Sequence, residues 1–148
     1  MASVAHLFCA PKRRLPMEEM DSVEALEDRG FVGCTHGRKG SQRQILLVDL
    51  ETLHTMDLLP GSIRENITTE GLNVNGLVIG EQVRVGPALL QVSAVCTPCD
   101  QLERIRPGLR REIYGRRGML CRVLQGGIVR KGDAIKREPI SASALKTS

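Results

Sequence analysis

The apolar residues of this chain come in short runs, which glycine, proline, asparagine or aspartate interrupts every few residues. Long stretches with the 3.6-residue apolar spacing of packed helices are missing from the sequence. Short apolar runs bounded by turn-forming residues are typical of β-strands. The pattern therefore predicts a mainly β fold with a few short helices. A closed or nearly closed β-barrel is favoured because closure removes exposed strand edges, although the pattern alone does not distinguish it from a sandwich.

The expected elements follow from these runs. Strands are predicted over residues 3–9, 44–48, 77–80, 82–86, 88–95, 119–124 and 133–136, with a hairpin at Gly86-Pro87. Short helices are predicted over residues 49–57, 100–106 and 109–114. Asp49 can cap the first of these, because its carboxylate can accept from free backbone amides of the first turn.

The length of 148 residues suits one domain, which we expect to span residues 1–138. Residues 139–148, rich in Ser, Ala, Lys and Thr, have little to bury and are predicted to form a flexible tail. Aromatic residues make up only 2% of the chain, so the core must be aliphatic. The same scarcity makes recognition of single-stranded nucleic acid by stacking unlikely.

The charge and cysteine content limit the partners and the compartment. The formal charge of +4 makes an anionic partner plausible, although local basic runs are usually solvated faces. We find neither a secretory signal nor a membrane-spanning apolar segment, and therefore expect a cytoplasmic protein without a membrane partner. Five cysteines in that setting predict reduced thiols and no disulfide framework.

The first candidate site is Cys96-Thr97-Pro98-Cys99, predicted between a strand and a short helix. Two thiols at this spacing can bind a metal or exchange a disulfide, and a helix N-terminus can stabilise a thiolate. A structural zinc site would need two more ligands at a matching spacing, and a thioredoxin-like dithiol would need a βαβ unit. A buried cysteine pair that only packs is a further alternative.

The second candidate site is the glycine-rich basic loop over residues 33–44, which contains His36, Arg38 and Arg43. Glycines allow backbone amides to approach an anion, and arginines add forked donors suited to phosphate. The loop lacks the Walker arrangement, and by composition a mobile surface loop is about equally plausible. His36 is a candidate base or ligand, although a lone loop histidine is more often only solvated or hydrogen-bonded.

The third candidate site lies in residues 59–71, where Arg64, Glu65 and Asn66 stand between two isoleucines. If Glu65 and Asn66 are buried they must be hydrogen-bonded, because an unpaired buried polar group costs on the order of 1–3 kcal/mol. They would then brace a site. The alternative is a solvent-facing turn.

Together these segments resemble the MOSC family, found at the C-terminus of molybdenum-cofactor sulfurases, in mitochondrial amidoxime-reducing proteins and as small prokaryotic proteins. The resemblance extends from about Val4 to Lys136. It rests on Arg43-Gln44 before Ile-Leu-Leu-Val, on residues 59–71, on Ile79-Gly80 and Val85-Gly86, on Pro98-Cys99, and on Gly118 through Gly127 followed by Lys131-Gly132-Asp133. The resemblance implies a barrel of the pyruvate-kinase type.

The resemblance also implies binding of the pterin-based molybdenum cofactor, molybdopterin, or sulfur transfer connected with it. The family cysteine, a metal ligand or persulfide carrier, matches Cys99. Arg43 and the loop with Arg38 would hold the cofactor's phosphate, and His36 matches a family histidine. A sulfur donor or a molybdoenzyme-maturation protein is the implied partner.

Glu65 and Asn66 would line or brace the pocket of such a domain. Three positions depart from the family pattern: Cys34 replaces a frequent aspartate, Arg64 replaces a glycine or alanine, and Cys96 is not part of the usual Pro-Cys pattern. Arg64 would narrow the pocket or add an anion contact. The alternatives are a non-catalytic module that binds an acidic partner through the basic loops, and redox sensing by Cys96 and Cys99.

Overall fold

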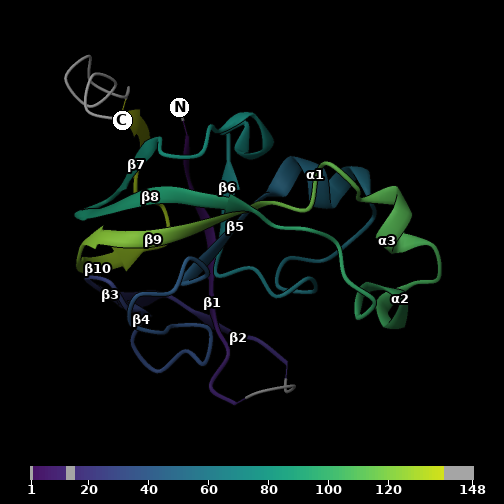
Figure 1. The fold of residues 1–148 in the computed structure, drawn as a ribbon, viewed down its shortest axis with the longest axis horizontal. Coiled ribbons are helices and arrows are strands. Elements are labelled where there is room, and N and C mark those ends of the chain that lie inside the picture. The colour runs from purple at the N-terminus through teal and green to yellow at the C-terminus, as the bar shows by residue number, and fades with distance from the viewer. Residues whose placement is uncertain (1, 13–15, 139–148) are drawn as a thin grey trace.

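A computed structural model describes residues 2–12 and 16–138 of the chain, and these residues form two β-sheets with short helices beside them (Figure 1). The strands are β1 (Ser3–Cys9), β2 (Glu18–Met20), β3 (Ser22–Leu26), β4 (Gly30–Phe31), β5 (Ile45–Asp49), β6 (Ile67–Glu70), β7 (Gln82–Val85), β8 (Ala88–Val95), β9 (Met119–Gln125), β10 (Gly127–Arg130) and β11 (Ile135–Glu138). The helices are α1 (Leu50–Thr55), α2 (Leu102–Ile105), α3 (Leu109–Glu112) and a 3-10 turn, η1 (Val74–Gly76).

The larger sheet has eight strands in the order β11-β7-β8-β9-β5-β6-β1-β2. Its described ladders are antiparallel except between β5 and β6, which run parallel because α1 and the loop after it return the chain to the starting end of β5. The smaller sheet has the order β10-β3-β4. This topology places β5 and β6 in the middle of the larger sheet, beside α1 (Figure 1).

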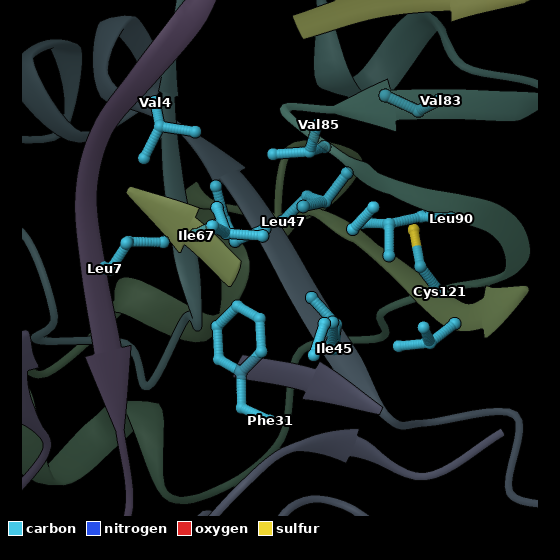
Figure 2. Packing of buried hydrophobic residues seen from close by; sticks show 14 of the residues in the cluster. Val4, Leu7, Phe31, Ile45, Leu47, Ile67, Val83, Val85, Leu90 and Cys121 are labelled. Carbon is cyan, nitrogen blue, oxygen red and sulfur yellow. The ribbon is translucent and has the colours of Figure 1, made fainter. Parts of the chain in front are cut away.

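Strand β5 is buried on both faces, which explains its unbroken apolar sequence. Ile45 and Leu47 point into the main core with residues such as Leu7, Ile67 and Leu90 (Figure 2). Leu46 and Val48 point the other way, since side chains alternate along a strand. They belong to a second cluster with residues of all three α-helices: Leu53, Leu102, Leu109 and Ile113. The second cluster anchors α2 and α3 at the side of the molecule that holds the cavity described below.

The prediction of a mainly β fold with a few short helices is confirmed. Strand 3–9, strand 44–48, the hairpin at Gly86-Pro87 and the three short helices lie within a few residues of their predicted positions. Asp49 caps α1 as expected, accepting from the Thr52 amide at 3.1 Å.

Other predictions about the elements are wrong or unconfirmed. Residues 77–80 form no strand, and Val78 and Ile79 are exposed there, because the chain leaves η1 in a turn. Strands β2, β3, β4, β6 and β10 were not predicted. Among the described residues no closed barrel is found, since β11 and β2 end the sheet and one isolated bridge, between Ser3 and Ala134, links β1 to the segment before β11. The barrel therefore remains a prediction.

Two further predictions concern the chain ends and the membrane. The flexible tail predicted for 139–148 lies outside the described residues. Within the part of the chain that the structure describes, no helix is long and apolar enough to cross a membrane.

Candidate functional site

A cavity of about 940 Å³ lies where three segments meet: the loop after β4, the loop before β6 and the segment joining β8 to α2. Leu46 of β5, Leu102 of α2 and Leu120 of β9 contribute apolar surface to its lining. The polar and charged lining residues are Thr35, His36, Arg38, Ser41, Arg43, Ser62, Arg64, Asn66, Gln101, Arg104 and Arg117, together with the two thiols Cys96 and Cys99. The three predicted candidate sites, far apart in the sequence, therefore meet at one cavity.

The lining is strongly cationic. Five of its residues are arginines, and none of the described lining residues is an aspartate or glutamate. A concave surface of one charge sign raises the local concentration of ligands of the opposite sign. The cavity is therefore suited to an anionic ligand.

Cys99 is exposed and lines this cavity. Its backbone carbonyl accepts from the Leu102 amide at 3.1 Å, but no hydrogen bond to its sulfur is found among residues 2–12 and 16–138. The expected helix N-terminus beside the thiol is not formed, because α2 begins only at Leu102 and has four residues. Cys99 is thus an accessible thiol on the cavity lining. Cys96 is buried, and the thiols of both residues are free.

Asn66 is fully buried and connects three segments through its side chain. Its Oδ1 atom accepts from the Leu46 amide at 2.9 Å, and its Nδ2 atom donates to the Phe8 carbonyl at 3.3 Å and to the Cys34 sulfur at 3.3 Å. The backbone donor and acceptor fix which end of the amide is oxygen. Asn66 is therefore held in one orientation.

This orientation determines how His36 is presented. The Nδ1 atom of His36 lies 3.2 Å from Asn66 Oδ1, which only accepts hydrogen bonds, so Nδ1 must carry the hydrogen. In the neutral ring the lone pair then lies on Nε2. His36 lines the cavity and is partly buried, so its Nε2 atom is an acceptor available to a ligand there.

Glu65 does not line the cavity but lies fully buried behind it. Its Oε2 atom accepts from the Gly61 amide and from the Thr68 hydroxyl, both at 2.9 Å, whereas Oε1 has no partner in the structure. Burial raises the pKa of Glu65, and the hydrogen bonds from Gly61 and Thr68 and the charge of Arg117 oppose that shift. Glu65 therefore braces the loop before β6.

The three arginines that the sequence analysis named as candidate site residues line the cavity. Arg38 and Arg43 belong to the glycine-rich loop, in which the Arg43 amide donates to Ser41 Oγ at 3.0 Å and the Arg38 carbonyl accepts from Gln44 at 3.0 Å. Arg64 has a φ of 66°, in the left-handed region that favours glycine. A residue with a Cβ atom is strained in this conformation.

One buried arginine of the cavity lining was missed by sequence reasoning. Arg117 is 7% exposed and lines the cavity, and one terminal nitrogen donates to the Ile63 carbonyl at 2.9 Å. Its Nε and Nη1 atoms are buried without a hydrogen-bond partner, as is Oγ of Ser62 in the same lining. Basic runs usually lie on solvated faces, so nothing in the pair Arg116-Arg117 indicated that one of them is buried.

Cys34 and Cys9 were also missed as site residues, and both are buried beside the cavity wall formed by His36 and Asn66. The Cys34 sulfur accepts from the Ala10 amide at 3.3 Å in addition to Asn66. The sequence analysis named Cys34 only as a departure from the family pattern.

Comparison with known protein families identifies the family of this chain. The model of the MOSC domain family matches residues 38–136. The chain belongs to the MOSC family. The matched range includes Arg38, Arg43, Asn66 and Cys99, and begins after Cys34 and His36.

Solved structures of similar fold cover nearly the whole domain. The YuaD protein from Bacillus subtilis is 22% identical with a TM-score of 0.77, covering 95% of this chain and 98% of its own. YiiM from Geobacillus stearothermophilus is 19% identical with a TM-score of 0.76, covering 97% of this chain and 78% of its own. YiiM from Escherichia coli is 20% identical with a TM-score of 0.71, covering 95% of this chain and 71% of its own. No curated protein sequence matches the chain significantly. At these identities the likeness concerns the fold of the MOSC domain.

Proposed function

We propose that this MOSC domain binds the pterin-based molybdenum cofactor in its cationic cavity, or carries sulfur for it, through the thiol of Cys99. The observation that carries the proposal is a pairing of two groups in one cavity. An exposed thiol, Cys99, lies on the same lining as Arg117, a buried guanidinium with unpaired N–H groups. A soft sulfur ligand and an anion-binding group are the two features that a metal cofactor with a phosphate needs.

The residues present fit such a group. A buried donor without a partner costs on the order of 1–3 kcal/mol, and an oxyanion at Arg117 and Ser62 would remove that cost. The cavity volume of about 940 Å³ lies near the upper end of common ligand pockets, about 300–1,000 Å³. Because the described lining has no carboxylate, the phosphate would meet no repulsion from it.

Each lining residue would then have a role. Arg117 and Ser62 would hold an anionic group in the interior, and Arg38 and Arg43 would hold or guide it from the glycine-rich loop. His36 would accept a hydrogen bond from the ligand through Nε2. Cys99 would provide the thiolate ligand. When bound, the cofactor supplies a redox-active metal centre.

Sulfur transport is the second form of the proposal and uses the same thiol. The Cys99 thiolate would attack the terminal sulfur of a persulfide on a sulfur donor. A new sulfur–sulfur bond forms on Cys99, the donor's bond breaks, and the donor leaves as a thiolate. This step needs an exposed sulfur, which Cys99 has. A sulfur donor or a molybdoenzyme-maturation protein would be the partner.

The test uses freshly purified full-length protein. We expect it to release a fluorescent oxidised pterin after acid treatment, with molybdenum in metal analysis, or to show a persulfide on Cys99 by mass spectrometry. Cys99→Ser should lose the persulfide and the metal. Arg117→Gln should lower pterin retention by about tenfold or more, since a hydrogen bond to a charged group contributes about 1.5–3 kcal/mol.

The matched control is Arg84→Gln, because Arg84 pairs with Glu138 away from the cavity and its loss removes the same charge. The control should retain the pterin as the wild type does. Equal losses in Arg84→Gln and Arg117→Gln would contradict a specific anion site. A wild type without pterin, molybdenum or persulfide, also after incubation with molybdopterin, would overturn the proposal.

The alternative is a module that binds an acidic partner through its basic loops, and it predicts a different result for the same variants. Its binding would fall steeply with salt and would be unaffected by Cys99→Ser. The cavity arginines argue against it, since they surround a concave site.

A further inference from the structure

The Cys34 sulfur lies in a pocket of N–H donors. Ala10 donates its amide and Asn66 its Nδ2 hydrogen, each at 3.3 Å. The Thr35 amide donates to the Ala10 carbonyl at 2.7 Å, which ties the loop carrying Cys34 to the end of β1. Converging N–H donors around a sulfur favour its charged form over its neutral form.

Cys9, the last residue of β1, directly precedes Ala10, whose amide donates to the Cys34 sulfur, and the two thiols interact. A hydrogen bond from the Cys9 thiol, together with the amides of Ala10 and His36 and the charge of His36, lowers the pKa of Cys34 to about 5 against the opposing effect of burial. The hydrogen bond to Cys34, burial and nearby negative charge raise the pKa of Cys9. Because Cys34 also receives the two N–H donors, a thiolate in this pair is favoured on Cys34 rather than on Cys9.

The other three cysteines lack this arrangement. Cys121 is fully buried, and burial alone raises its pKa to about 12. Cys96 is buried, and Cys99 is exposed. In the described parts of the chain, only Cys34 has hydrogen bonds from nitrogen donors to its sulfur.

We propose that Cys34 is a site of oxidation by small peroxides, with Cys9 as the resolving thiol that closes a Cys9–Cys34 disulfide. In the first step the Cys34 thiolate attacks one oxygen of hydrogen peroxide, a sulfur–oxygen bond forms, the oxygen–oxygen bond breaks and hydroxide leaves. In the second step the Cys9 sulfur attacks Cys34, a disulfide forms, and the oxygen leaves as water with the proton of Cys9. The two sulfurs together lose two electrons, which the peroxide gains.

The disulfide would alter the cavity, and this consequence rests on the proposed function. Oxidation removes the anionic acceptor of Asn66 Nδ2, and Asn66 in turn holds His36 through Oδ1. Ligand retention in the cavity should therefore fall when the pair is oxidised. The disulfide itself can be tested without any ligand, so its failure is distinguishable from failure of the proposed function.

Trypsin separates the relevant thiols, which makes peptide mapping decisive. Cys9 lies in the peptide ending at Lys12, Cys34 in peptide 30–38, Cys96 and Cys99 together in peptide 85–104, and Cys121 in peptide 118–122. Full-length protein is treated with an equimolar amount of hydrogen peroxide, blocked with an alkylating agent, digested and analysed by mass spectrometry. We expect the first two peptides joined by a disulfide in most of the protein.

Variants assign the order of the steps. Cys9→Ser should stop at a sulfenic acid on Cys34, which dimedone traps. Cys99→Ser is the matched control and should form the disulfide at the wild-type rate. If Cys34→Ser fails to fold, the peptide map of the peroxide-treated wild type still shows whether the Cys9–Cys34 disulfide forms. Free Cys9 and Cys34 after treatment, or loss of two hydrogens within peptide 85–104 instead, would overturn the proposal.

Discussion

Two of the cysteines at the cavity, Cys99 and Cys34, are opposite in environment. The Cys99 sulfur is exposed on the lining, and none of the described residues donates a hydrogen bond to it. The Cys34 sulfur is buried, and two nitrogen donors lie at 3.3 Å from it. Access and activation are therefore separated: Cys99 can reach a large ligand, whereas the N–H donors around Cys34 stabilise an anion at a buried sulfur.

The largest effect is expected for Asn66→Ala, on the Cys34 side. The substitution removes four side-chain contacts and leaves the Leu46 amide and the Phe8 carbonyl without these partners in the interior. We expect the free energy of unfolding to fall by about 3–5 kcal/mol, because several buried polar groups lose their bonds together. Urea unfolding measures it. Asn75→Ala, which removes one part-buried contact with Asp49, is the control and should cost about 1 kcal/mol or less.

The next effect is the dependence of stability on pH between about 5 and 9. The pKa of Cys34 is lowered from 9.0 to about 5 in the folded chain, so the native state binds fewer protons than the unfolded state in this window. Stability from this group is therefore fully present above the unfolded pKa and lost as pH falls through the folded pKa.

We expect the free energy of unfolding of the wild type to rise by an amount on the order of 1–3 kcal/mol from pH 5.5 to 8.5. Cys34→Ser should lack this rise. The difference between the two proteins in chemical unfolding at each pH removes the contribution of other titrating groups. If the free energy of unfolding changed with pH equally in the wild type and in Cys34→Ser, Cys34 would not be a buried thiolate. Cys99→Ser is the control and should keep the full pH dependence of the wild type.

A smaller effect of opposite sign is expected for Arg64→Gly. Arg64 holds a φ of 66°, which costs a residue with a Cβ atom roughly 1–2 kcal/mol, partly offset by the greater unfolded-state freedom of glycine. The free energy of unfolding should rise by about 0.5–1 kcal/mol, while retention of an anionic ligand weakens. Thermal unfolding and pterin retention measure the two. Arg104→Gly, on the lining in α2, should lower stability instead, since glycine weakens a helix.

The smallest effect is expected for Cys99→Ser. An exposed side chain without hydrogen bonds contributes little, so the free energy of unfolding should change by less than about 0.5 kcal/mol. The same variant should lose the fastest alkylation by iodoacetamide, because Cys99 is the accessible thiol. Urea unfolding measures the change in stability, and peptide mapping of the alkylated native protein measures the labelling of each cysteine. Iodoacetamide is larger than hydrogen peroxide. If it labelled Cys34 faster than Cys99, Cys99 would not be the more accessible thiol.

Much of the fold was predictable because local pattern and final burial agree. The apolar run at residues 45–48 indicated a buried strand, and β5 is buried on both faces. Val78 and Ile79 had the same local pattern but are exposed, because no strand pairs with them. Short strands such as β4, with two residues, carry no detectable period and are formed by pairing with β3.

The candidate site was partly predictable in the same way. Cys99, His36, Arg43 and Asn66 could be named from motifs and from the family resemblance, and they line one cavity. The resemblance also pointed to position 34, where an anionic residue is frequent. It did not indicate that Cys9, on another strand, supplies the second thiol.

The sequence alone indicated a mainly β chain, a resemblance to the MOSC family and a candidate reactive cysteine after proline, Cys99. Only the tertiary structure decided that Arg117 is buried without full pairing and that Cys34 lies among N–H donors. The reason is physical. Residue type sets what a group can donate, accept or ionise, but burial and partner atoms set the energy of doing so, and both come from segments distant in the sequence.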